Sequence, residues 1–139
     1  IVDPWNEISM EEMGASETHF IREALGKFRR FARSHQVAIW IVAHPAKQYK
    51  DKITGDYRPP NLYDISGSSR WRDMCDNGIT IFRKAENEGE DRHAVELHVG
   101  KIKHKYVGQV GNVDMRYDYD SGRFTDQLHE LKQPNINGE

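Results

Sequence analysis

Two polar side chains follow apolar segments of the chain. Asp3 ends the short run Ile1-Val2, and His44 ends the run Val37–Ala43. In open α/β sheets, ligands bind beyond the carboxyl ends of the strands. A carboxylate there can hold Mg²⁺, and an imidazole can donate a hydrogen bond to a phosphate oxygen. Taken alone, each residue more often has a structural role. The two together predict a phosphate site only if other motifs of the chain also indicate one.

A compact cationic segment lies further along the chain. Lys101, Lys103 and Lys105 alternate within five residues. On a strand, these three side chains share one face, where like charges repel unless an anion lies opposite. The alternative is a solvated edge strand that its lysines protect from pairing with other chains.

The stretch between residues 45 and 72 combines cations, hydroxyls and flexible backbone. It carries six Lys/Arg and three Asp, a local positive excess that suits contacts to a phosphate backbone. The alternative is a polar loop followed by an amphipathic helix, and we expect Trp71 itself to lie in the core. The predicted nucleic-acid-binding residues are Lys47, Lys50, Lys52, Arg58, Ser66, Gly67, Ser68 and Arg70.

Composition excludes several classes of protein. The 139 residues correspond to about one domain, and a formal net charge of −2 excludes a globally basic nucleic-acid coat. The longest apolar run is far shorter than the roughly 20 residues that span a bilayer, so we expect no membrane partner. A single cysteine, Cys75, allows no internal disulfide framework and suits a reducing compartment.

Two metal chemistries also fit poorly. The seven histidines are scattered, and one cysteine makes no zinc-ligand spacing. A metal nuclease of the Asp…Glu-x-Lys type would need a lysine where Glu96-Leu97-His98 has histidine.

The periodicity of the first half predicts an α/β fold. Ser16 or Thr18 can cap a helix whose apolar residues recur on one face between Phe20 and Ala32. Val37–Ala43 is short, continuous and β-branched, which is typical of a strand buried on both faces. A helix between two such strands forms a right-handed βαβ unit, so we expect parallel strands with flanking helices.

The second half predicts mostly strands. We expect a short helix over 62–76, a strand over 78–83, an acidic turn over 86–91, and an antiparallel pair from 94–103 and 113–118. Residues 1–125 form the predicted domain, and residues 126–139 form a polar, disordered tail.

The order of these motifs resembles the C-terminal half of the RecA-like motor domain of DnaB-family replicative helicases. The resemblance is carried by Ile1-Val2-Asp3, the run ending in His44, Asp64-Ile65-Ser66-Gly67-Ser68 and the segment from Lys101 to Gly108. It is closest to phage-type primase-helicases and Twinkle-like helicases. It implies part of a P-loop NTPase core of parallel strands and flanking helices, with a C-terminal antiparallel hairpin.

The resemblance also implies an activity and roles for four residues. The activity is that of an ATP-dependent DNA helicase that forms a hexameric ring and translocates on single-stranded DNA. Asp3 corresponds to the Walker B aspartate, which orders Mg²⁺ and the attacking water, and His44 to the sensor of the γ-phosphate. Lys103 and Lys105 correspond to the pair that reaches ATP in the adjacent subunit. Lys105 stands where many relatives have an arginine finger.

One expected motif is missing from these residues. No G-x-x-x-x-G-K-[ST] loop occurs among the 139 residues, so we expect the Walker A loop upstream of Ile1, in a longer parent enzyme. The segment alone is then predicted to hydrolyse no ATP. The alternative is a nucleic-acid-binding or assembly module without hydrolysis. We expect the cytoplasm of a bacterium or phage-infected cell, and an organellar parent stays open.

Overall fold

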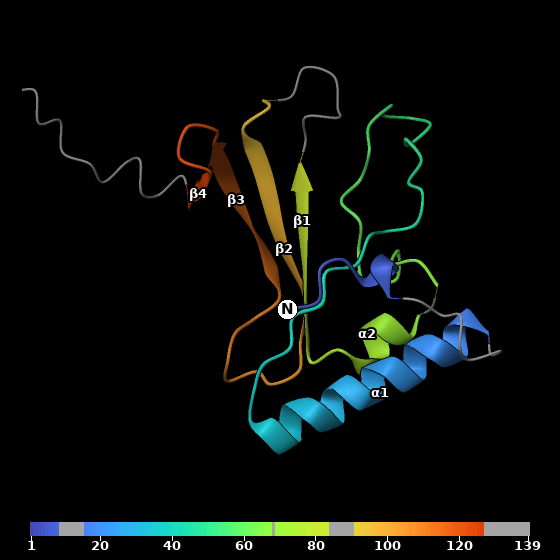
Figure 1. Ribbon diagram of the computed structural model, residues 1–139. Coiled ribbons are helices and arrows are strands. Elements are labelled where there is room, and N and C mark those ends of the chain that lie inside the picture. Colours follow the sequence, from blue (N-terminus) through green and yellow to red (C-terminus); the bar gives the residue numbers. More distant parts are fainter. Residues whose placement is uncertain (9–15, 68, 84–90, 127–139) are drawn as a thin grey trace, which may run out of the picture.

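The computed structural model describes residues 1–8, 16–67, 69–83 and 91–126. Within them the chain is α/β, with one antiparallel sheet and two helices that lie together at one end of that sheet (Figure 1). Ser68, the acidic turn except for Asp91, and the predicted tail beyond Asp126 lie outside the described residues.

The long helix α1 spans Glu17–His35 and confirms the predicted helix. Ser16 occupies the N-cap position in an extended conformation, and Glu17 in the first turn suits the positive end of the helix dipole. Gln36 ends the helix in the left-handed conformation, with φ of 53°. Phe31 departs from the expected buried face, because it is 52% exposed and stacks on the ring of His35.

The core is a cluster of aromatic and aliphatic side chains between α1 and the segments around it. Trp5, in the short 3-10 helix η1 (Trp5–Glu7), lies 4.8 Å from the ring of Trp71 and 5.6 Å from that of Phe20. Ile21 is fully buried beside them. Trp71 therefore lies in the core, as predicted, and its indole nitrogen donates to the carbonyl oxygen of Ser66 at 3.1 Å.

Helix α2 is much shorter than predicted and spans only Arg70–Met74. Residues 61–64 form a turn instead, because side-chain oxygens capture its backbone N–H groups. The Asp64 carboxylate accepts from the nitrogen of Asn61 at 2.7 Å, and the Asn61 side chain accepts from the nitrogen of Tyr63 at 2.8 Å.

The expected parallel strands are reduced to one parallel bridge, between Val2 and Ile41. The prediction of a strand over Val37–Ala43 buried on both faces is wrong for the described structure, since Trp40 is 60% exposed and Val42 41% exposed. The segment has a bridging partner on one side only, so it does not become the centre of a sheet.

The sheet consists of β1 (Asn77–Arg83), β2 (Ala94–Ile102), β3 (Gly111–Asp118) and β4 (Arg123–Asp126), paired antiparallel in that order. The first three confirm the predicted strands within two residues at each end. Strand β4 was not predicted. Because β2 ends at Ile102, Lys103 and Lys105 lie in the following loop, which corrects the expectation that they share a strand face with Lys101.

Candidate functional site

Asp3 and His44 leave the two bridged segments at the same end. Around the Val2–Ile41 bridge, the nitrogen of Val42 donates to the oxygen of Val2 at 2.9 Å, and the nitrogen of Trp5 donates to the oxygen of Val42 at 2.8 Å. The segments run in the same direction, so both polar residues follow at the carboxyl end. Both are exposed to solvent.

The chemistry of Asp3 fits one kind of metal site. Mg²⁺ in phosphate-binding enzymes is usually held by one or two carboxylates, with water and phosphate oxygens supplying the rest. No group of three His, Cys, Asp or Glu in the described part of the chain could hold a metal ion. Asp3 is thus a single exposed carboxylate at this end of the bridged segments.

The backbone of His44 is bonded to the neighbouring loop. Pro45 and Ile65 form an antiparallel bridge, the nitrogen of Ala46 donates to the oxygen of Asp64 at 2.7 Å, and the nitrogen of Ser66 donates to the oxygen of His44 at 3.4 Å. Residues 44–46 and 64–66 are therefore directly connected through their backbones.

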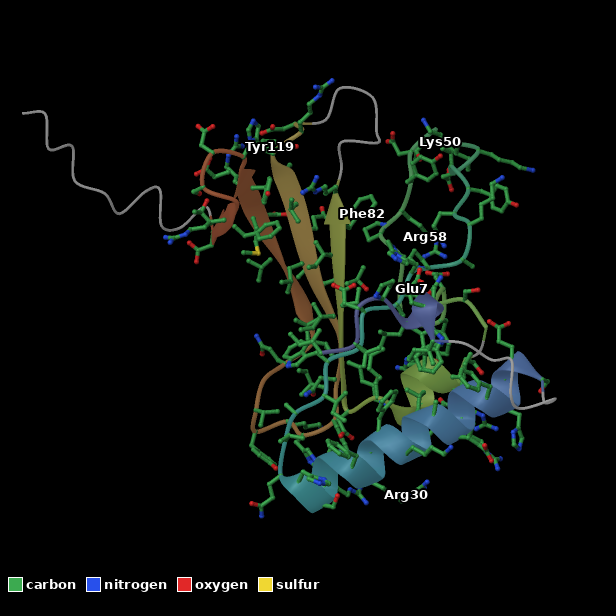
Figure 2. All side chains as sticks on the ribbon, viewed as in Figure 1. Glu7, Arg30, Lys50, Arg58, Phe82 and Tyr119 are labelled. Atoms are coloured by element: carbon green, nitrogen blue, oxygen red, sulfur yellow. The ribbon has the colours of Figure 1, made fainter. Side chains whose placement is uncertain are left out.

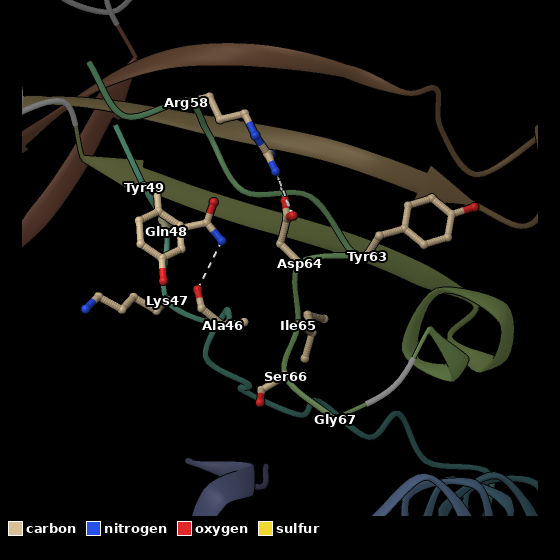
Figure 3. Close-up of a pocket in the computed structure, with 10 residues that line it drawn as sticks. All are labelled: Ala46, Lys47, Gln48, Tyr49, Arg58, Tyr63, Asp64, Ile65, Ser66 and Gly67. Atoms are coloured by element: carbon tan, nitrogen blue, oxygen red, sulfur yellow. Dashed lines mark hydrogen bonds and ion pairs between the residues drawn. The ribbon is translucent and has the colours of Figure 1, made fainter. Parts of the chain in front are cut away.

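Residues 64–66 form one wall of a hollow that we call the basic hollow, with a volume of about 470 Å³ (Figure 3). The hollow is lined by Ala46, Lys47, Gln48, Tyr49, Arg58, Tyr63, Asp64, Ile65, Ser66 and Gly67. The structure thus brings together four of the predicted nucleic-acid-binding residues, which are Lys47, Arg58, Ser66 and Gly67.

The other predicted binding residues lie apart from the hollow. Lys50 and Lys52 belong to the same loop as Arg58, and Figure 2 shows Lys50 further out along that loop. Arg70 begins α2, with its guanidinium 3.7 Å from the carboxylate of Asp73. Ser68 is outside the described residues.

Arg58 and Asp64 form a two-bond ion pair inside the hollow. Two guanidinium nitrogens of Arg58 each lie 2.7 Å from a carboxylate oxygen of Asp64 (Figure 3). The hydrogen bonds from Arg58 lower the pKa of Asp64, and the N–H of Asn61 lowers it further against the opposing effect of burial. The same hydrogen bonds raise the pKa of Arg58. The charge of Arg58 is thus compensated within the chain, whereas Lys47 forms no ion pair with a described residue.

Exposed aromatic rings lie among these cations. The Lys47 ammonium is 5.8 Å from the ring centre of Tyr49, and the Arg72 guanidinium is 5.0 Å from that of Tyr63. Tyr49 is 76% exposed and Tyr63 59% exposed. Cations beside exposed aromatic rings are typical of surfaces that bind single-stranded nucleic acid. Sequence reasoning missed both tyrosines, although their alternation with lysine and arginine was the available signal.

Gly67 supports the hollow by packing closely against α1. Its φ is +92°, and an added Cβ would lie 2.5 Å from the Glu17 carboxylate and 2.6 Å from Ile21. The hydroxyl of Thr18 donates to its carbonyl oxygen at 3.2 Å. The positive φ favours glycine here, and an added Cβ would force the Glu17 and Ile21 side chains to move.

The two lysines of the predicted pair, Lys103 and Lys105, make different contacts. The Lys103 ammonium lies 2.6 Å from the carboxylate of Asp76, and this contact lowers the pKa of Asp76. Lys101 donates to the carbonyl oxygens of Arg72 and Asp73. Lys105 is exposed and has no ion pair or side-chain hydrogen bond to any described residue.

Comparison with known proteins supports the resemblance inferred from motif order. The Twinkle homolog protein, chloroplastic/mitochondrial, of Arabidopsis thaliana is 35% identical to this chain over 127 residues, which are 91% of the chain. The chain is therefore similar to one part of a Twinkle homolog. It covers 17% of the length of that relative, and no family model matches it.

The segment has three candidate functional regions. They are the end of the bridged segments with Asp3 and His44, the basic hollow, and the loop after β2 that carries Lys105. Among the helices that the structure describes, none has the length and apolar character needed to cross a membrane.

Proposed function

We propose that the chain is the C-terminal half of the RecA-like motor domain of an ATP-dependent DNA helicase that works as a hexameric ring on single-stranded DNA. The observation that carries this proposal is the backbone connection between His44 and the basic hollow in a Twinkle-like sequence. A motor needs such a link, because hydrolysis at one place must move a strand held at another.

In this proposal Asp3 and His44 serve the nucleotide. Asp3 would hold Mg²⁺ together with phosphate oxygens of ATP, and the ion would supply positive charge for phosphoryl transfer. The His44 imidazole donates a hydrogen bond to a γ-phosphate oxygen and registers its presence. The loop that cradles the β- and γ-phosphates is absent from the 139 residues, so the parent protein supplies it.

The basic hollow and its loop serve the DNA. Lys47 contacts a backbone phosphate at the hollow, while Lys50 and Lys52 extend the cationic track along the loop. Ser66, Gly67, Ser68 and Arg70 continue the phosphate contacts, and Arg58 joins them when a phosphate displaces Asp64. Tyr49 and Tyr63 offer exposed rings on which bases stack.

Lys105 serves the nucleotide of a neighbouring subunit. Its side chain is exposed, and its charge is paired with no carboxylate among the described residues of its own chain. A group that acts on another subunit needs both properties. A lysine stabilises transition-state charge as a point charge and lacks the two-pronged geometry of arginine.

A second candidate is a nucleic-acid-binding or assembly module without hydrolysis, because the basic hollow and its exposed tyrosines can bind nucleic acid without ATP. The Arabidopsis relative is named as chloroplastic/mitochondrial, so we propose an organellar location beside the bacterial or phage-infected cytoplasm.

The two candidates differ in ATP hydrolysis by the full-length protein that carries this segment. We expect hydrolysis stimulated by single-stranded DNA, and we expect Asp3→Asn to abolish it while DNA binding persists. Glu7→Gln is the matched control, because it removes another exposed carboxylate close in sequence. DNA binding without any hydrolysis in the wild-type protein would favour the second candidate.

A further inference from the structure

We propose that Asp76 is a positioning residue for Lys105, and that it acts by clamping Lys103 at the base of the loop 103–110. The inference rests on the proposed function, in which Lys105 reaches the nucleotide of a neighbouring subunit. It assigns Lys103 to its own chain and Lys105 to the neighbour, although the resemblance gave both lysines the same role.

Asp76 holds Lys103 by two separate hydrogen bonds. The backbone nitrogen of Lys103 donates to the backbone oxygen of Asp76 at 2.9 Å, and the ammonium donates to the carboxylate at 2.6 Å. The adjacent residues, Asn77 and Ile102, are the last paired residues of the β1–β2 ladder. The clamp thus lies at the point where the ladder stops and the loop begins.

The segment that carries Asp76 is itself fixed from two sides. A guanidinium nitrogen of Arg29, in α1, donates to the oxygen of Met74. Lys101 donates to the oxygens of Arg72 and Asp73. The positive charges of Arg29 and Arg33 also favour the ionised carboxylate of Asp76. Hydrogen bonds from α1 and from Lys101 therefore hold the segment that precedes Asp76, and this segment supports the base of the loop.

Beyond the clamp, the loop extends its side chains into solvent. Tyr106 is 85% exposed, Val107 60% and Val110 63%, and Lys105 stands among them without a described partner. The ring of His104 stacks on that of Tyr106, with centroids 5.4 Å apart. A fixed base with an exposed tip presents a group at a set place, and such preorganisation lowers the entropic cost of docking.

The positions of Lys103 and Lys105 along the loop give a physical reason for their different roles. The Lys103 ammonium is occupied by a carboxylate of its own chain, so it cannot reach a neighbour without breaking that ion pair. Lys105 lies two residues beyond the clamp, and its position depends on where the clamp holds the backbone. A shift of about 1 Å in a catalytic group can cost on the order of 10²-fold in rate.

The test uses steady-state hydrolysis by the full-length protein with single-stranded DNA present. We expect Asp76→Asn to lower kcat about tenfold, as for a modest loss of positioning, while the KM for ATP stays unchanged. Asp76→Glu, which keeps the charge, should retain most of the activity. Asp114→Asn removes an exposed carboxylate of β3 and serves as the control. Thermal unfolding of each variant checks that the fold survives.

The decisive comparison combines Asp76→Asn with Lys105→Ala. If Asp76 acts through Lys105, adding Asp76→Asn to Lys105→Ala lowers the residual kcat no further. An equal loss in both backgrounds would show a merely structural role and overturn the inference. An unchanged kcat in Asp76→Asn, with Lys105→Ala inactive, would overturn it and leave the proposed function standing. Wild-type hydrolysis that is insensitive to Lys105→Ala would reject the trans-acting site and the inference with it.

Discussion

The carbonyl oxygen of His44 accepts a hydrogen bond from the backbone nitrogen of Ser66 at 3.4 Å. One residue therefore follows the apolar segment beside Asp3 and also contacts the wall of the basic hollow. Backbone hydrogen bonds on both sides of Pro45 make the connection short and direct. In the proposed function, nucleotide and nucleic acid influence each other through these few residues of main chain.

This connection predicts that His44→Ala separates DNA binding from hydrolysis. The substitution removes the imidazole but keeps the backbone bond to Ser66, so the affinity for single-stranded DNA should stay within about twofold. Stimulation of hydrolysis by DNA should be lost. Titration of ATPase rate against a DNA oligonucleotide measures both quantities. Full stimulation in His44→Ala would remove the sensor role.

The loop lysines should carry salt-dependent binding. Changing Lys47, Lys50 and Lys52 together to Ala should weaken single-strand binding. It should also flatten the plot of log affinity against log salt by a slope of roughly 0.7 for each phosphate that is no longer neutralised. Fluorescence anisotropy at several salt concentrations measures this slope. The matched control changes Arg22, Lys27 and Arg30, three exposed cations of α1. Equal slopes for the two triple variants would contradict the role of the loop.

Gly67→Ala should destabilise the fold by a few kcal/mol, about 1–3 from the left-handed backbone and more from the clash with Glu17 and Ile21. Gly55→Ala is the matched control. Gly55 also has a positive φ, of +76°, but has no atom within 4 Å of the added Cβ. Urea unfolding of the two variants separates strain from clash. Equal destabilisation would show that the packing against α1 contributes nothing.

The stability contributed by the ion pair between Arg58 and Asp64 should be lost only in acid. The folded-state pKa of Asp64 lies below its ordinary value of 3.8, so the stability it contributes is complete above that value. This contribution is lost as the pH falls through the lower folded-state pKa. The difference in unfolding free energy between wild type and Asp64→Asn should therefore be constant between pH 5 and 7 and shrink below about pH 4. A difference that changes near neutral pH would point to another group.

Local sequence patterns predicted the helix and strands whose formation depends mainly on the residues within them. The one-face spacing from Phe20 to Ala32 defined α1, and alternation defined β2 and β3. Val37–Ala43 failed because a buried strand needs partners on both sides, and the described chain supplies a single bridge. Strand β4 is only four residues long and pairs with β3 at the edge of the sheet. So short a segment has little sequence pattern from which a strand could be predicted.

The candidate site was predictable where the residue type is the signal. Asp3, His44 and the loop cations could be named from their positions after apolar runs or within a basic stretch. Asp76 and Asp64 could not, because their roles come from partners brought close by folding. Asp76 and Lys103 are 27 positions apart in sequence, and no pattern in the residues between them predicts their contact.

The central claim is that this segment forms half of an ATP site shared between subunits. Its most direct test mixes Asp3→Ala subunits with Lys105→Ala subunits of the full-length protein, each with little activity alone. If Lys105 acts on a neighbour, some interfaces in a mixed ring pair an intact Asp3 with an intact Lys105, and hydrolysis should partly return. No recovery in rings shown by mass to be mixed would contradict the account.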